Sequence, residues 1–172
     1  LMTAYANSST EAGGTVYNKK QPKVGLDFSH RLTKLVLNIT NGSGISDAEL
    51  SGLKVEVTKQ WKTATYAPDF DGIGLEKTVA GIALLTRADG TFAEAILFPD
   101  DLTGESPTKG RQLVFTFTTG EVFYWNIPDT KSFNAGEKNI YDITINRTGL
   151  EVTASISDWN KGNGEGESGS AE

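Results

Sequence analysis

The sequence has 172 residues, of which 37% are hydrophobic, and this predicts a single domain with one buried core. Its net charge of −6 at pH 7 would repel a phosphate backbone, so we expect no nucleic-acid partner. The absence of cysteine excludes disulfides, thiolate metal sites and cysteine nucleophiles. No run approaches the roughly 20 apolar residues that a membrane-spanning helix needs.

The chain begins with a polar lead-in, residues 1–22, which precedes a β-rich domain that we place at residues 23–159. Within this domain helix signals are scarce, and apolar residues alternate with polar ones at period two in most segments. The alternation predicts strands that bury one face each.

The first of these segments contains His30, the only histidine, and its apolar face changes parity. Apolar side chains lie at even positions up to residue 32 and at odd positions from residue 35 onward. A strand cannot do this without an extra residue or a break, so we predict a bulge or corner near Thr33-Lys34, where the chain passes between sheets. His30 would then face inward beside Phe28 and Leu32.

We interpret His30 as a packed residue that is bonded to backbone. A metal site would need further ligands, and the chain has no second histidine and no cysteine. A catalytic base would need a nucleophile and an orienting group, and no spacing in the sequence supplies them. We therefore predict no metal, no cofactor and no enzymatic activity.

The remaining elements are predicted as a strand at residues 53–59 and three hairpins. The hairpins join residues 79–87 to 90–98 through Ala88-Asp89-Gly90, residues 111–119 to 122–127 through Gly120-Glu121, and residues 139–147 to 150–156 across Thr148-Gly149. About eight strands without covering helices indicate an all-β fold, an antiparallel sandwich or a barrel, of which we favour the sandwich. Residues 160–172 form a Gly/Glu/Ser tail that we expect to be disordered.

The segment Leu26-x-Phe28-x-His30-x-Leu32-x-Lys34-Leu35-x-Leu37 resembles the opening of a domain in fimbrillin-like proteins, the subunits and relatives of type V pili in Gram-negative anaerobes. Later segments resemble the same family, among them Leu97-Phe98-Pro99, Tyr124-Trp125-Asn126-Ile127-Pro128 and the final Ile156-x-Asp158-Trp159. The resemblance covers roughly residues 1–159. Its structural motif includes Phe28, His30, Lys34 and Trp159.

This resemblance implies a Greek-key, transthyretin-like β-sandwich that is exported as a lipoprotein precursor and displayed at the outer membrane or in a fimbrium. Residues 1–4 resemble the segment that enters the second of two such domains. A signal peptide, a lipid-bearing cysteine and a first domain would then lie upstream. Any contact with the membrane would be made only through that upstream anchor.

The resemblance also implies fimbrial assembly or cell adhesion through β-strand addition and loop contacts, with other fimbrial subunits or host surface proteins and glycans as partners. In shaft subunits of the family an apolar C-terminal strand fills a groove of the next subunit. The tail of this chain has no apolar alternation and would be a poor donor strand. We therefore expect an anchor, tip or accessory protein rather than a shaft subunit.

An alternative function is carbohydrate binding by Trp61, Tyr66 and Phe70. These aromatic residues lie in a stretch of poor alternation that we place between strands, where they could stack on sugar rings or anchor a protein contact. They could equally cap one end of the sandwich, because large apolar side chains usually bury. We expect Trp125 and Trp159 to belong to the core or its rim.

Overall fold

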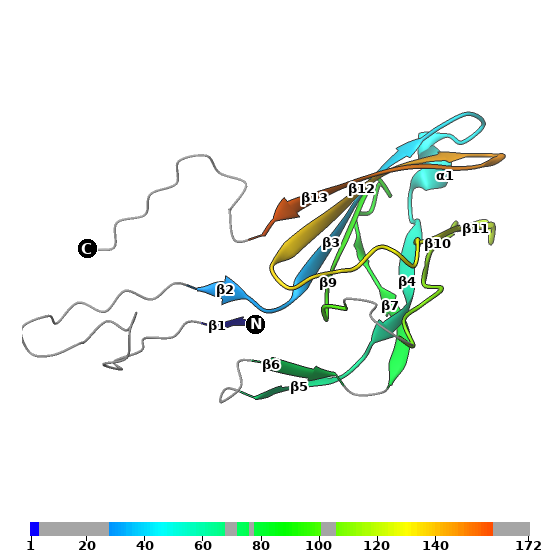
Figure 1. The fold of residues 1–172 in the computed structure, drawn as a ribbon. Coiled ribbons are helices and arrows are strands. Elements are labelled where there is room, and N and C mark those ends of the chain that lie inside the picture. Colours follow the sequence, from blue (N-terminus) through cyan, green and yellow to red (C-terminus); the bar gives the residue numbers. More distant parts are fainter. Residues whose placement is uncertain (4–27, 68–71, 76–77, 101–105, 160–172) are drawn as a thin grey trace, which may run out of the picture.

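A computed structural model describes residues 1–3, 28–67, 72–75, 78–100 and 106–159. Two sheets face each other and form a β-sandwich (Figure 1). The five-stranded sheet has the order β13-β12-β3-β9-β8, whose strands are Gly149–Asp158, Glu137–Asn146, Thr33–Asn41, Phe92–Leu97 and Leu85–Thr86. The four-stranded sheet has the order β11-β10-β4-β7, whose strands are Val122–Asn126, Gln112–Thr116, Lys54–Trp61 and Val79–Ala83.

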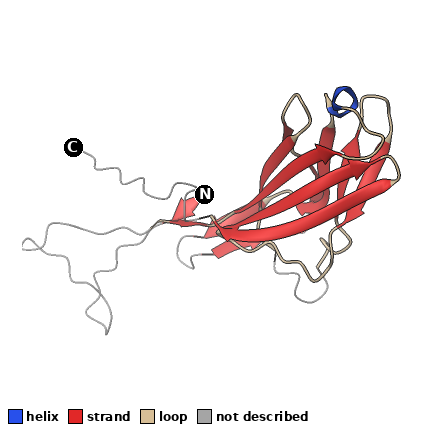
Figure 2. Ribbon diagram, turned by 90° about the horizontal axis from the view of Figure 1, so that it is seen from above, coloured by secondary structure: helices blue, strands red, loops and turns tan. Residues whose placement is uncertain are grey.

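The structure also describes two small two-stranded sheets and one helix. β1 (Met2–Thr3) pairs with β2 (Ser29–His30), and β5 (Ala64–Ala67) pairs with β6 (Gly72–Leu75). The short helix α1 (Asp47–Leu50) closes one end of the sandwich, whereas β1 and β2 lie at the opposite end (Figure 2). No helix in these ranges is long and apolar enough to cross a membrane.

The core lies between the two sheets and is built by the alternation seen in the sequence. In β3 the odd-numbered residues Leu35, Leu37 and Ile39 are buried, and β12 contributes Tyr141, Ile143 and Ile145 to the same interior. The facing sheet adds Val55, Val57, Leu113 and Phe115. Each such side chain contributes on the order of 1.5–3 kcal/mol by leaving water, so this interior is the main stabilising element.

The sandwich is confirmed, but it is not wholly antiparallel. β3 and β12 lie side by side in parallel, with Leu37 opposite Tyr141 and Ile39 opposite Ile143. Every other pairing of neighbouring strands that the structure describes is antiparallel. The Greek-key, transthyretin-like connectivity stays a prediction.

The second and third of the three predicted hairpins are confirmed. β10 pairs with β11 from Gln112↔Asn126 to Thr116↔Val122, and β12 pairs with β13 along ten positions from Glu137↔Asp158 to Asn146↔Gly149. The predicted strand at residues 53–59 is β4.

The first predicted hairpin is wrong over its first half. Residues 79–83 form β7, which pairs with β4 of the four-stranded sheet, and only Leu85 and Thr86 pair with β9. The chain changes sheets at Leu84, whose side chain is buried and whose N–H donates to the Val55 carbonyl of β4 at 2.9 Å. Residues 79–87 are therefore two short strands in different sheets.

The break predicted near Thr33-Lys34 is also present, at Arg31-Leu32 between β2 and β3. His30 is half-buried there, as expected, but the prediction that Phe28 faces inward is wrong, because its side chain is 58% exposed.

Candidate functional site

The sheet change at Leu84 leaves part of β9 uncovered, because the edge strand β8 is shorter than β9. β8 is only two residues long and pairs with β9 at Leu85↔Glu94 and Thr86↔Ala93. From residue 95 onward, no strand among the described residues pairs with this side of β9. An uncovered edge presents backbone donors and acceptors that another strand can use.

Two hydrogen bonds show which residues of β9 direct their backbone to this edge. The Ile39 N–H donates to the Thr91 carbonyl, on the side of β3, whereas the Arg87 N–H donates to the Phe92 carbonyl, on the side of β8. Because backbone groups alternate along an antiparallel strand, the even-numbered residues of β9 face β8. Ile96 therefore directs its N–H and C=O to the open edge.

A hollow of about 270 Å³ lies beside this open edge and is mainly apolar. It is lined by Lys34, Leu85, Glu94, Ala95 and Ile96. Leu85 and Ile96 are 74% and 58% exposed, and the Lys34 ammonium contacts the Glu94 carboxylate at 2.8 Å. The hollow can take an apolar side chain of a strand that pairs with Ile96, which is the usual arrangement in β-strand addition.

Sequence reasoning missed this hollow, although the sequence carries a signal for it. Leu84 and Leu85 are adjacent apolar residues in a segment that otherwise alternates, so their side chains cannot share a face. Leu84 is 7% exposed and Leu85 is 74% exposed. The pair marks the sheet change and the exposed apolar residue that follows it.

The residues of the family motif fall into two places. Lys34 lines the hollow, while the His30 ring stacks on the Trp159 indole with 4.0 Å between ring centroids and 5° between ring planes. Phe28 lies near them in sequence but is mainly exposed. The motif therefore contributes to the hollow through one residue only.

Trp61 and Tyr66 lie within strands, although the sequence placed them in a segment between strands. Trp61 is the last residue of β4 and Tyr66 lies within β5, and both are half-buried. The indole N–H of Trp61 is buried without a partner among the described residues. Phe70 lies outside the described residues, and sugar binding by these three residues stays a prediction.

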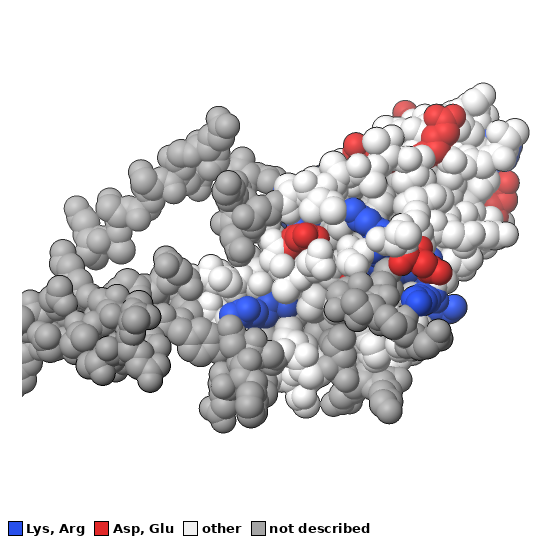
Figure 3. Space-filling model, viewed as in Figure 1, with Lys and Arg blue, Asp and Glu red and all other residues white. Residues whose placement is uncertain are grey.

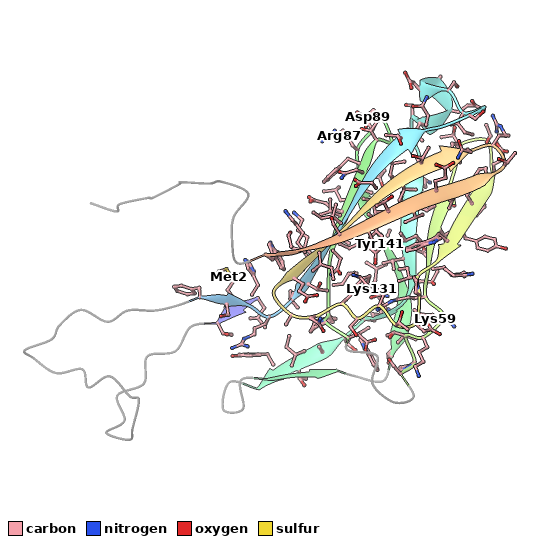
Figure 4. The ribbon with its side chains drawn as sticks, turned by 45° about the horizontal axis from the view of Figure 1, so that its top comes forward. Met2, Lys59, Arg87, Asp89, Lys131 and Tyr141 are labelled. Atoms are coloured by element: carbon pink, nitrogen blue, oxygen red, sulfur yellow. The ribbon has the colours of Figure 1, made fainter. Side chains whose placement is uncertain are left out.

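A buried polar cluster lies at another place between the sheets, and it too was missed. Arg111 is 1% exposed, with its guanidinium 4.0 Å from the centre of the Phe133 ring, and it donates to the Lys131 carbonyl. Tyr141 lies in the interior (Figure 4), and burial raises its pKa to about 12. Burial also lowers the pKa of Arg111. Because the guanidinium is packed against the Phe133 ring and is almost fully buried, we assign these residues to the stability of the core.

Charged side chains do not define a site on the face drawn in Figure 3, where basic groups lie beside acidic ones rather than in a continuous patch. In the described part of the chain no three His, Asp or Glu side chains gather as a metal ion would require. The open edge of β9 with its apolar hollow is therefore the candidate site.

The fimbrillin-like family matches residues 5–159 of this chain. The protein belongs to the fimbrillin-like family. A Bacteroides uniformis protein described as a candidate fimbrium subunit, Fim1C, is 36% identical over 161 residues, which cover 90% of this chain and 52% of that protein. The chain thus spans about half the length of the curated relative that it matches.

Solved structures share the fold. A candidate cell adhesion protein from Bacteroides uniformis superposes with a TM-score of 0.74 at 30% identity, over 92% of this chain and 66% of that one. The tip fimbrial protein Mfa3 from Porphyromonas gingivalis superposes with a TM-score of 0.50 at 15% identity, over 77% of this chain and 52% of that one. The similarity to Mfa3 concerns the fold alone.

Proposed function

We propose that this chain is a domain of a non-enzymatic surface protein that takes part in fimbrial assembly or cell adhesion, and that it accepts a strand of a neighbouring subunit at the open edge of β9. The observation that carries the proposal is the uncovered backbone of Ile96 beside the apolar hollow. Membership of the fimbrillin-like family supports it, as do relatives described as a fimbrium subunit and a cell adhesion protein.

Within a fimbrium the protein acts as an anchor, tip or accessory subunit rather than in the shaft. The sequence after Trp159 lacks the apolar alternation that a donor strand needs to hold its register. The domain can therefore accept a strand, whereas residues 160–172 would make a poor donor strand. Host surface proteins and glycans are further proposed partners.

The described fold is the second domain of a longer exported protein of a Gram-negative bacterium. Support comes from the partial coverage of the relatives, 52% and 66% of their lengths. An upstream lipid anchor would hold the protein at the outer membrane, with the domain exposed at the cell surface or in the fimbrium.

The role in assembly is tested on the full-length precursor, which is treated with a trypsin-like protease and followed by light scattering and electron microscopy. A trimmed product that stays monomeric is the expected result for an anchor, tip or accessory subunit. Growth into rods or heat-labile ladders would contradict it and would assign the protein to the shaft.

The open edge is tested with Ile96→Pro in the producing bacterium. Proline removes the N–H that faces the edge and leaves the ladder to β3 intact, so the fold should survive while strand addition is lost. Immunoblots of sheared fimbriae should show the wild type and the control Ile96→Val, but not Ile96→Pro. Equal incorporation of all three, each with an unchanged melting temperature, would exclude this edge as the assembly contact.

A further inference from the structure

The outer face of the hairpin β10–β11 is a neutral surface with an exposed aromatic residue at its centre. Odd-numbered residues of both strands face the core, with Leu113 and Phe115 buried, so the even-numbered residues face outward. These outward residues are Gln112, Val114, Thr116, Val122, Tyr124 and Asn126, and none of them is charged. We call them the hairpin platform.

The hairpin platform differs from the outer face of the other sheet. There the outward positions of β3, β9 and β12 include Lys34, Glu94, Lys138 and Asp142, and Lys34 pairs with Glu94. In a chain whose residues are 22% charged, six adjacent uncharged outward side chains form a distinct surface. It borders Lys54 and Glu56 of β4, which lie opposite Thr116 and Val114 and carry opposite charges. A surface with no net charge fits a neutral partner.

Tyr124 provides an exposed ring at the middle of this surface. Its side chain is 64% exposed although it lies in the centre of β11, opposite the half-buried Val114. A tyrosine ring combines a broad apolar face with a hydroxyl group, and it has little conformational freedom to lose on binding. It can pack against the C–H face of a sugar ring.

The polar neighbours of Tyr124 are held in place. The Gln112 side-chain amide donates to the Asn126 side-chain oxygen at 2.7 Å, so the two amides are fixed together at one end of the platform. The carbonyl oxygen of Gln112 and the amide nitrogen of Asn126 retain hydrogen-bonding capacity. Fixed amides beside an aromatic ring can hydrogen-bond the hydroxyl groups of a sugar.

Outward-facing residues on neighbouring strands form a row that starts at Tyr124 and crosses the four-stranded sheet. Register places Tyr124 beside Val114, Val114 beside Glu56 of β4, and Glu56 beside Ala83 of β7. A Cβ at Gly81 would lie 2.2 Å from Glu56 Oε1, so glycine leaves room for the carboxylate above β7. At a strand spacing of about 4.8 Å the row spans about 14 Å, which is long enough for several sugar units.

From these observations we propose that the hairpin platform and Glu56 bind an extended neutral polysaccharide, a β-1,4-linked glucan, mannan or xylan, with one sugar ring on Tyr124. The outward residues from Tyr124 to Ala83 lie in one line across the sheet, which fits an extended chain better than a compact or branched one. This site is separate from the open edge of β9 and does not depend on strand addition there.

The experiment titrates the full chain with cellohexaose, mannohexaose and xylohexaose by isothermal calorimetry and by NMR. At least one probe should bind saturably, and Tyr124→Ala should weaken binding by about threefold to tenfold, the range expected for loss of one aromatic contact. Tyr124→Phe keeps the ring and should bind. Phe28→Ala is the matched control at another exposed aromatic residue, 58% exposed and outside the hairpin platform, and should also bind.

Three results would overturn the proposal. The first is no binding of any of the three probes at a concentration of about 5 mM, and the second is binding that Tyr124→Ala leaves unchanged. The third is binding that Tyr66→Ala abolishes while Tyr124→Ala does not, which would place the sugar at the Trp61 and Tyr66 region. The melting temperature of each variant shows whether a loss of binding reflects unfolding.

Discussion

At the scale of single residues, the only histidine of the chain has a packing role. The His30 ring stacks on the Trp159 indole. The backbone N–H of Trp159 donates to the Gly136 carbonyl at 2.7 Å, and the backbone N–H of Gly136 donates to the Leu32 carbonyl at 2.9 Å. The stack therefore joins the segment before β3 to the end of β13. Sequence reasoning identified the packing role but could not find the partner, 129 positions away, because no local pattern connects them.

We expect His30→Ala to lower the free energy of unfolding by about 0.5–1.5 kcal/mol, since it removes one ring–ring contact at a half-buried position. A double-mutant cycle with Trp159→Ala, followed by chemical denaturation, measures the coupling between the two rings. Effects that simply add, with no coupling energy, would show that the stack does not contribute to stability.

Gly90 is a second residue whose identity is required by its surroundings. Its φ is +74°, and a Cβ there would lie 2.0 Å from the Leu50 carbonyl oxygen of α1. Arg87 and Asp89, labelled in Figure 4, mark the same turn. The turn residues were recognised in the sequence, but the close approach of α1 was not, since it depends on the tertiary packing.

Gly90→Ala should destabilise the protein by about 2–3 kcal/mol, because it combines an unfavourable φ with a clash against backbone. The matched control is Gly120→Ala, where φ is +91° and no atom lies within 4 Å of the added Cβ. This control should cost only about 1 kcal/mol. Equal losses for the two variants in thermal denaturation would contradict the clash.

At the scale of elements, one arginine links the helix α1 to two turns. Ser46 and Glu49 form a capping box, and Arg147 of the β12–β13 turn contacts both Glu49 of α1 and Glu121 of the β10–β11 turn. The sequence Ser46-Asp47-Ala48-Glu49 is a typical helix start, and our sequence reading did not use it.

The hydrogen bond from the Ser46 backbone, together with Arg147, lowers the pKa of Glu49 from 4.5 to about 2. A carboxylate whose pKa is lowered in the folded state stabilises the protein above its ordinary pKa, and this contribution is lost as the pH falls from 4.5 towards 2. Glu49→Gln should therefore make the free energy of unfolding depend less on pH between 4.5 and 2. Arg147→Gln should reduce this dependence less, because the Ser46 hydrogen bond remains.

Urea denaturation of both variants and the wild type across this pH range measures the effect. Asp89, whose pKa is also lowered, by hydrogen bonds from Thr91, should leave a residual slope in every variant. A wild-type slope that Glu49→Gln does not change would rule out the proposed role of this carboxylate.

The elements themselves were predictable to different degrees. Strands β10, β12 and β13 carry mostly alternating residues, and tight turns join β10 to β11 and β12 to β13, so both hairpins follow from local sequence. The division of residues 79–87 into β7 and β8 was not predicted. Both strands are short, and the sheet to which each belongs depends on the distant strands β4 and β9.

At the scale of the whole molecule, we expect the sequence beyond Trp159 to be dispensable for folding. Deletion of residues 160–172 should change the free energy of unfolding by less than about 0.5 kcal/mol, because that sequence has no apolar alternation to pack. Calorimetry of the shortened chain tests this. A loss of several kcal/mol, or a loss of incorporation into fimbriae, would give the tail a role that its composition does not predict.

The sequence by itself determined that this chain is all-β and favoured a sandwich, and it determined where most strands and turns lie and which family the motifs resemble. It could do so because alternation and turn chemistry act over a few neighbouring residues. Only the tertiary structure decided the parallel pairing of β3 with β12, the change of sheet at Leu84 and the open edge at Ile96. These features arise where segments far apart in the chain compete for the same sheet edge. Their outcome depends on packing across the whole core, of which a local pattern such as Leu84-Leu85 records only a part.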